Sequence, residues 1–295
     1  MKEREEWIDV SQLKERAWFG LSEEERGISW LVLLDVLSPS KSKHRLQIGQ
    51  RKAAYADLAE FHATPSASPN YLSPSIASQT KMNREIEKDV KRITRRREED
   101  QAYIRAMRVF SKKNPVIGYV QGMCEIFKVF YEVYVSHFEE QEVEALAYFS
   151  FAKIAGGALD HFSSGQQGVE RAIEEIEKQM GRYCKDVSVR FKELGVEVKY
   201  FAYNWMSTFM FREFSGHKKV MDAHFSLGVG EFMKFNVSFA LSVVIFFKKT
   251  VITKNFEDTL FVLQNTSEYP WTEKELDKLL AISYIIYSGG TFQEE

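Results

Sequence analysis

The chain has 295 residues, with 40 lysines and arginines against 42 aspartates and glutamates, and its formal net charge is −2. This balance disfavours a protein that coats nucleic acid over its whole surface. Hydrophobic residues make up 44% of the chain and charged residues 28%, which excludes a disordered polypeptide. The two cysteines, Cys124 and Cys184, lie far apart, which excludes a disulfide scaffold, and they form no zinc-binding pattern.

Two segments near the N-terminus give opposite predictions. Ser22 and Glu25 have the spacing of a capping box, in which each side chain bonds the backbone N–H of the other. The apolar run over 28–34 follows at once and predicts a helix. The segment 62–80 holds three of the six prolines together with five serines, which remove or compete for helical hydrogen bonds. It therefore predicts a loop insertion.

The second half of the chain has further helical patterns. Apolar residues recur at helical spacing over 169–180, which predicts an amphipathic helix. Thr272 and Glu275 form a second capping-box pattern before another apolar run. The apolar stretch 237–247 is shorter than the roughly 20 residues that a membrane span needs, so we expect a buried core helix there. Because few stretches alternate with period 2, the sequence predicts an all-α protein.

The length sets the expected domain organisation. Single hydrophobic cores stop growing at about 250–300 residues, so we expect one large domain or two fused lobes. Gly156, Gly157 and Gly165 mark a softer break in the helical pattern, and we expect the two lobes to meet near it. The charged N-terminus lacks the apolar segment of a signal peptide, which favours a soluble protein of a reducing compartment.

Common nucleotide-binding and metal-binding motifs are absent from the sequence. There is no P-loop pattern and no H-E-x-x-H pair, and Gly228 and Gly230 lack the third glycine of a dinucleotide fingerprint. His217 and His224 share a helix face, but no third ligand is clustered with them, so we expect structural or surface roles. We therefore expect no metal ion and no cofactor of the chain's own.

A basic run follows one of the predicted helices. Ile86, Asp89 and Arg92 recur every three residues, which places them roughly on one side of a helix. Five of the seven residues over 91–97 are basic, and interleaved acidic residues make a solvated helix face one interpretation. A carboxylate three residues before an arginine can also orient the guanidinium, whose planar fork suits phosphate oxygens. The spacing alone leaves both interpretations open.

A second segment, 114–123, reads Asn-Pro-Val-Ile-Gly-Tyr-Val-Gln-Gly-Met. Asn-Pro is a turn signal, and Gly118 loosens the entry to the apolar helix that follows. Tyr119 and Gln121 are therefore predicted to lie at a helix N-terminus. A glutamine in this place either caps backbone groups or orients a water molecule, because its amide both donates and accepts hydrogen bonds.

Together the two segments resemble the TBC domain, the catalytic module of Rab GTPase-activating proteins. That family carries an I-x-x-D-x-x-R motif followed by a Y-x-Q motif. The matching residues here are Ile86, Asp89, Arg92, Tyr119 and Gln121. Further likeness to the family's R-x-x-x-W and W…F…D stretches lies at Arg26, Trp30, Trp205, Phe209 and Asp222. The resemblance covers about residues 15–290.

The resemblance implies an elongated, two-lobed helical fold. It implies one TBC domain over about 15–290, with both motifs in an N-terminal lobe of about 15–155 and a C-terminal lobe of about 156–290. The 62–80 insertion, the basic cluster at 95–97 and Met221, where the family usually has tryptophan, depart from the family pattern. These departures bear on packing and on the choice of partner.

The resemblance also implies how the chain acts. Arg92 would be an arginine finger and Gln121 a glutamine finger, both supplied in trans to a GTP-bound Rab-family GTPase that holds the GTP and magnesium itself. The residues implied to support the fingers or to bind the GTPase are Ile86, Asp89, Tyr119 and Gly122. The residues implied to be structural are Arg26, Trp30, Trp205 and Asp222.

Two other functions compete with this interpretation. One is a catalytically silent TBC-like scaffold that binds a GTPase or an adaptor. The other is a nucleic-acid-binding protein that uses the basic run 91–97, which the interleaved acidic residues disfavour. The expected setting is vesicle trafficking, with a cytoplasmic protein recruited peripherally to endomembranes, no nucleic-acid partner and no direct insertion into the membrane.

Overall fold

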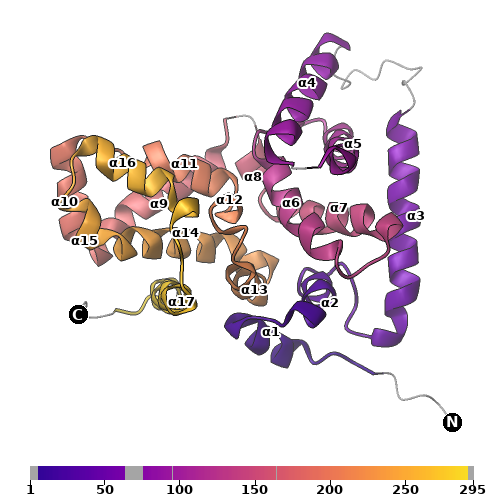
Figure 1. Ribbon diagram of the computed structural model, residues 1–295, viewed down its shortest axis with the longest axis horizontal. Helices are drawn as coiled ribbons and strands as arrows, with labels where there is room; N and C mark the ends of the chain where they lie inside the picture. Colours follow the sequence, from indigo (N-terminus) through magenta and orange to yellow (C-terminus); the bar gives the residue numbers. More distant parts are fainter. Residues whose placement is uncertain (1–5, 64–75, 95, 164, 292–295) are drawn as a thin grey trace.

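The structure is a computed structural model, and it describes residues 6–63, 76–94, 96–163 and 165–291. Within these ranges the regular secondary structure is helical, and β pairing is limited to an isolated bridge between Trp7 and Ser40. The all-α fold predicted from the apolar spacing is therefore confirmed. Figure 1 shows an elongated molecule in which two groups of helices lie side by side along the long axis.

The first group, here called the N-terminal lobe, lies on the right of Figure 1. Its helices are α2 (Glu23–Leu33), η1 (Lys41–Lys43), α3 (His44–Ala63), α4 (Ile76–Ile93), α5 (Arg97–Lys113), α6 (Met123–Tyr134) and α7 (Glu140–Gly157). The short helix α8 (Leu159–Phe162) follows and packs mainly against α9 (Gln167–Tyr183) of the second group. Helix α6 lies at the centre, because it contacts α2, α4, α5 and α7. Its first residues follow directly on the Tyr119–Gln121 segment, so the lobe's central helix supports that segment.

The second group, here called the C-terminal lobe, follows in sequence and lies on the left of Figure 1. Its helices are α9 (Gln167–Tyr183), α10 (Lys185–Leu194), α11 (Lys199–Ser207), α12 (Phe211–Phe214), α13 (Lys218–Ser226), α14 (Val229–Phe246), α15 (Lys248–Val251), α16 (Phe256–Gln264), η2 (Thr266–Glu268) and α17 (Glu273–Tyr287). Helix α14 packs against α9, α11, α13 and α17 and forms the core of this lobe.

Both predicted capping boxes are present. The Ser22 N–H donates to the Glu25 carboxylate at 3.3 Å at the start of α2. At the start of α17 the Thr272 N–H donates to the Glu275 carboxylate at 2.9 Å, and the Glu275 N–H donates back to the Thr272 hydroxyl. Each box satisfies N–H groups that the first turn of a helix leaves without a carbonyl partner.

The two apolar patterns of the C-terminal half also form helices. The residues of the predicted stripe in α9 are all buried, from Val169 to Met180. Among the described residues α14 is the one helix long and apolar enough, by length and composition, to cross a membrane. It is mostly buried against the surrounding helices, which is the place expected of a core helix over 237–247.

The loop predicted over 62–80 is wrong at both of its ends. Helix α3 continues through Ala63 and helix α4 begins at Ile76, so the first and last residues of the predicted loop are helical. Residues 64–75, which contain the three prolines, lie outside the described residues. Proline disfavours a helix at its own position and just before it. A helix can therefore begin after Pro74, and α4 begins at Ile76.

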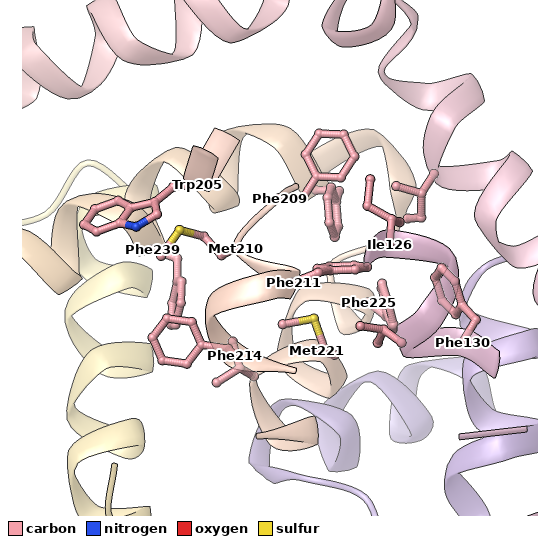
Figure 2. Packing of buried hydrophobic residues seen from close by; sticks show 14 of the residues in the cluster. Ile126, Phe130, Trp205, Phe209, Met210, Phe211, Phe214, Met221, Phe225 and Phe239 are labelled. Carbon is pink, nitrogen blue, oxygen red and sulfur yellow. The ribbon is translucent and has the colours of Figure 1, made fainter. Parts of the chain in front are cut away.

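The two lobes meet across an aromatic core. Figure 2 shows Phe130 of α6 close to Phe211 and Phe225 of the C-terminal lobe. The ring centroid of Phe130 lies 6.1 Å from that of Phe211 and 5.6 Å from that of Phe225. Met221 is fully buried beside this cluster. Buried aromatic contacts of this kind join the lobes rigidly, because each ring contributes a large apolar area.

The two lobes also contact each other at two other places. Helix α1 (Val10–Phe19) packs mainly against α13, so the first part of the segment assigned from the sequence to the N-terminal lobe contacts the C-terminal lobe. Gly157, at the end of α7, lies so close to Val229 that an added Cβ would be 2.7 Å from its Cγ1. A glycine is required there because the start of α14 occupies the space of a side chain.

Candidate functional site

Helix α4 presents Arg92 at its C-terminal end. Ile86 is fully buried and anchors the helix, while Asp89, one turn later, is 9% exposed. The Arg92 guanidinium lies 3.4 Å from the Asp89 carboxylate, and 53% of the Arg92 side chain is exposed. The carboxylate thus holds a guanidinium that remains open to a partner, because a planar guanidinium has five N–H donors and this contact uses few of them.

The segment that carries Gln121 is an irregular turn before α6. Gly118 has φ 65° and Gly122, the N-cap residue of α6, has φ 102°, and residues with a Cβ avoid both conformations. Gln121 lies in this turn with its side chain exposed, while Gly122 is buried. Tyr119 and Gln121 therefore precede the helix, as the sequence predicts, and the glycines fix the direction of the turn.

A hydrogen bond joins the two motifs. The Tyr119 hydroxyl donates to the Asp89 carboxylate at 2.8 Å, across 30 residues of sequence. Tyr119 also lies 3.1 Å from the Cys124 sulfur. Burial, together with Cys124 and Asp89, raises the pKa of Tyr119, and burial raises the pKa of Cys124 to about 12. Both groups therefore stay protonated, and Tyr119 remains a donor that ties the Gln121 turn to the Arg92 helix.

Further charges surround this bond. Glu125, in the first turn of α6, is largely buried, and burial raises its pKa while Lys128, Arg92 and Arg212 oppose the shift. Arg212 of the C-terminal lobe thus lies near enough to act on the same carboxyl group as Arg92. Electrostatic interaction at such a half-buried place is stronger than in water. Thr208 of the C-terminal lobe also lies next to Gly122, so both lobes contribute residues around the Gln121 turn.

The basic run continues beyond Arg92 on the surface. Lys91, Arg96 and Arg97 are exposed, whereas Arg95 lies outside the described residues. Glu87, on the same helix, is paired with Arg108 of α5 and does not neutralise the run. The cluster is therefore solvated, as one of the two sequence interpretations expects, and it lies at the end of the helix that presents Arg92.

The structural residues of the resemblance gather at a different place. The Asp222 carboxylate, fully buried in α13, accepts hydrogen bonds from the Leu21 N–H at 2.9 Å and from the Trp30 Nε1–H at 2.6 Å. The Arg26 guanidinium donates to the same carboxylate, with its Nε at 3.1 Å. Three donors that lie near residue 25 thus converge on one acid about 200 residues later, and this joins α2 to the C-terminal lobe.

Trp205 does not join that cluster. It is fully buried in α11 and packs edge-on against Phe201, with ring centroids 4.9 Å apart. Trp205 is therefore part of the core of the C-terminal lobe, and its role is packing.

Sequence reasoning missed three residues that lie beneath the Gln121 turn: Thr208, Arg212 and Glu213. Gly122 lies next to Thr208, and the buried Glu213 is paired with Arg212, whose side chain is 36% exposed. The available signal was the adjacent Arg-Glu pair inside the apolar run 209–214, because buried charges occur mostly in pairs. Spacing could not connect this run to Gln121, since nearly 90 residues separate them.

No metal centre was found among the described parts of the chain, where no three His, Cys, Asp or Glu side chains come together in a suitable group. His217 and His224 lie at opposite ends of α13, and His224 is buried among aromatic rings. The two motifs carry a guanidinium, at Arg92, and an amide, at Gln121, which are donors of the kind that bind anions.

Comparisons with known proteins show the family of the chain. The family model described as the Rab-GTPase-TBC domain matches residues 23–252. The GTPase-activating protein gyp1 of Schizosaccharomyces pombe is 23% identical over 315 residues, which cover 96% of this chain and 59% of that protein. TBC1 domain family member 22B of Homo sapiens is 23% identical over 301 residues, which cover 94% of this chain and 58% of that protein. The chain thus spans less than three fifths of the length of these relatives.

The fold is similar to two solved structures. The Ypt/Rab-GAP domain of Gyp1p matches with a TM-score of 0.87 and 20% identity, over 97% of this chain and 95% of that one. The Chlamydomonas flagellar RabGAP TBC domain matches with a TM-score of 0.66 and 15% identity, over 93% of this chain and 84% of that one. Since the family model also covers most of the sequence, the chain belongs to the Rab-GTPase-TBC domain family.

Proposed function

We propose that this chain accelerates GTP hydrolysis by a Rab-family GTPase, with Arg92 and Gln121 entering the active site of the GTPase. Membership of the Rab-GTPase-TBC family supports a Rab partner, and the S. pombe relative is named a GTPase-activating protein. The proposal includes a cytoplasmic protein that its GTP-bound partner recruits to endomembranes, and it needs no cofactor of the chain's own.

The observation that carries the proposal is the contact chain from Tyr119 through Asp89 to Arg92. The 2.8 Å bond from Tyr119 fixes the Gln121 turn against α4, and the 3.4 Å pair restrains Arg92 on the same carboxylate. The groups that do the holding are buried or half-buried, whereas Arg92 and Gln121 are exposed. Two exposed polar side chains on a rigid, buried support suit a site that acts on another protein.

The chemistry of GTP hydrolysis uses groups of this kind. Negative charge on the transferred phosphoryl group and the leaving oxygens is stabilised by an arginine supplied in trans, and the attacking water is oriented by an amide. Arg92 supplies a bidentate guanidinium, and Gln121 supplies both a donor and an acceptor for the water. The GTPase holds the nucleotide and magnesium, so this chain contributes positioning and charge.

The test is a phosphate-release screen of the chain against a panel of purified, GTP-loaded Rab GTPases. Arg92→Ala is expected to lower the stimulated rate by about 10³-fold or more, because arginine fingers contribute roughly 10³–10⁵. Arg16→Ala is the matched control, since Arg16 has the same 3.4 Å pairing distance to a glutamate and 52% exposure, but lies on α1. Full activity of Arg92→Ala would refute the arginine-finger mechanism.

Two further variants separate charge from geometry. Arg92→Lys should also fail, because a single ammonium group cannot reproduce the planar fork of the guanidinium. Gln121→Ala should lower the stimulated rate by about 10²-fold, the size of effect seen when one positioned transition-state donor is removed. Binding to several Rabs without any acceleration would favour the alternative of a silent scaffold.

A further inference from the structure

The turn between α11 and α12 has an unusual backbone. Phe209 and Met210 have φ values of 53° and 61°, in the left-handed region that side chains with a Cβ avoid. Both residues are fully buried, and Figure 2 shows them inside the aromatic core. Backbone strain of this kind persists only where the surroundings hold it in place.

This strained turn lies directly against the turn that carries Gln121. A Cβ added to Gly122 would lie 3.1 Å from the Thr208 Cγ2 and 3.7 Å from the Ser207 carbonyl oxygen. The Gly122 backbone therefore lies next to the Thr208 methyl group with little space for a side chain between them, and helix α12 also contacts α6. The position of the Gln121–Gly122 turn depends on the position of Thr208.

Thr208 is in turn held at the end of α11 and lies beside an ion pair. Its hydroxyl donates to the Asn204 carbonyl at 2.8 Å and lies 3.4 Å from the Glu213 carboxylate. Only 1% of the Glu213 side chain is exposed, and Arg212 bonds it through its Nε at 2.9 Å and its Nη2 at 2.5 Å. The Glu213 carboxylate, which Arg212 binds through two N–H donors, therefore has a restrained position beside the Thr208 hydroxyl.

We propose that Thr208 and Glu213 are positioning residues for Gln121. These two residues of the C-terminal lobe fix the position of the Gln121–Gly122 turn on one side, while Tyr119 ties the same turn to α4 on the other side. The two residues act through Gln121 and do not themselves reach the nucleotide. This inference rests on the proposed function, because it assigns them a part in stimulated hydrolysis.

The main test is Thr208→Ser, which removes the methyl group against Gly122 and keeps the hydroxyl. With the Rab that responds most strongly in the screen, we expect kcat to fall roughly fivefold or more with little change in KM, because small misplacements of a reacting group are costly. Thr259→Ser is the matched control, since Thr259 is equally buried but lies in α16. It should leave kcat unchanged.

A second measurement does not depend on activity. Hydrogen exchange of the backbone amides over 119–123 should become about threefold faster in Thr208→Ser and stay unchanged in Thr259→Ser, because the turn loses its contact. If no Rab responds to the wild-type chain, the proposed function fails, and the assigned role of Thr208 and Glu213 in hydrolysis fails with it. Unchanged exchange would overturn the inference by itself, whatever the hydrolysis result.

A double-mutant comparison separates positioning from general destabilisation. In a Gln121→Ala background the Thr208→Ser change should have no further effect on the residual rate, since its effect passes through Gln121. An equal fold-change in both backgrounds would show a merely structural role and overturn the inference. Glu213→Gln should behave like Thr208→Ser, whereas Glu144→Gln, which alters a two-donor pair with Arg105 in the N-terminal lobe, should not.

Discussion

Asp222 and Asp89 have the same kinds of partner and opposite surroundings. Each carboxylate binds an arginine and a polar group of an aromatic side chain from a distant part of the sequence. The Asp222 and Arg26 side chains are 0% and 7% exposed, whereas those of Asp89 and Arg92 are 12% and 53% exposed. The same chemical unit is thus buried around Asp222, where we call it the closed unit, and exposed to solvent around Asp89, where we call it the open unit.

The difference shows how burial separates stability from function. In the closed unit the carboxylate is fully buried and its partners come from within the protein, so removal of this acid leaves the buried Arg26 guanidinium with only the exposed Glu23 as an ionic partner among the described residues. In the open unit the arginine is solvated, and its pair with the carboxylate contributes little to stability, about 0–1 kcal/mol. The open arginine therefore keeps its remaining donors for another molecule. The comparison predicts a different outcome for similar substitutions in the two units.

The largest effect is expected from Asp222→Ala. Within the described part of the chain, it leaves the buried Arg26 guanidinium with only the exposed Glu23 as an ionic partner and removes the acceptor of the Leu21 and Trp30 N–H groups. We expect the free energy of unfolding to fall by about 3–5 kcal/mol, measured by urea denaturation. Asp222→Asn is the milder companion variant in case the alanine variant does not fold. A loss below about 1 kcal/mol would show that the closed unit is not a structural support.

The next effect is a pH dependence in the closed region. His224 lies two residues after Asp222 and is fully buried, and burial lowers its pKa from 6.5 to about 4. Because the folded-state pKa is below the unfolded value, stability is full above pH 6.5 and is lost as the pH falls toward 4. The loss amounts to about 3 kcal/mol in total.

Urea denaturation at several pH values measures this effect. His224→Leu should be less stable at pH 7, because the 2.7 Å contact of the ring with the Val220 carbonyl is lost. Its stability should nevertheless depend less on pH than that of the wild type over the same range. Burial also lowers the pKa of His161, so some dependence remains in the variant. Parallel pH profiles of the two proteins would contradict the assignment to His224.

A smaller effect is expected from Tyr119→Phe in the open region. The change removes the donor to Asp89, and we expect the free energy of unfolding to fall by about 1 kcal/mol. The stimulated rate should fall further than this loss of stability explains, because the Gln121 turn is released from α4. Tyr148→Phe is the control, since no hydrogen-bond partner of its buried hydroxyl was found within the described ranges. An unchanged stimulated rate in Tyr119→Phe would show that the hydrogen bond from Tyr119 to Asp89 plays no part in stimulated hydrolysis.

The smallest effect on stability is expected from Asp89→Asn. The asparagine still accepts a hydrogen bond from Tyr119, and the lost ion pair with Arg92 is half exposed, so unfolding should change by less than about 1 kcal/mol. The stimulated rate should nevertheless fall several-fold, because Arg92 loses its restraint. Destabilisation as large as that of Asp222→Asn would erase the distinction between the two units.

Much of the fold was predictable because its signals are local. The capping boxes at Ser22 and Thr272 and the apolar stripe of α9 involve residues within one or a few helical turns, where spacing determines the contact. The loop prediction over 62–80 was wrong at its ends, since the proline-rich composition was extended to residues that lie in α3 and α4. Composition averages over a window and does not locate an end.

The candidate site was predictable only in part. Ile86, Asp89 and Arg92 are on one helix, so their spacing already placed them together, whereas the resemblance was needed to connect them with Tyr119 and Gln121. The bond between Tyr119 and Asp89 spans 30 residues and depends on how α4 packs beside α6. No periodic pattern of residues in the sequence predicts such a contact.

The sequence by itself determined the helices, their caps and the two motifs, because these depend on neighbours along the chain. Only the tertiary structure decided which of two aspartate–arginine units is closed and which is open, since exposure depends on helices that pack from elsewhere. It also brought Thr208 and Glu213 beneath Gly122, through a strained turn whose conformation is held by burial. Both results concern distance in space between residues far apart in sequence.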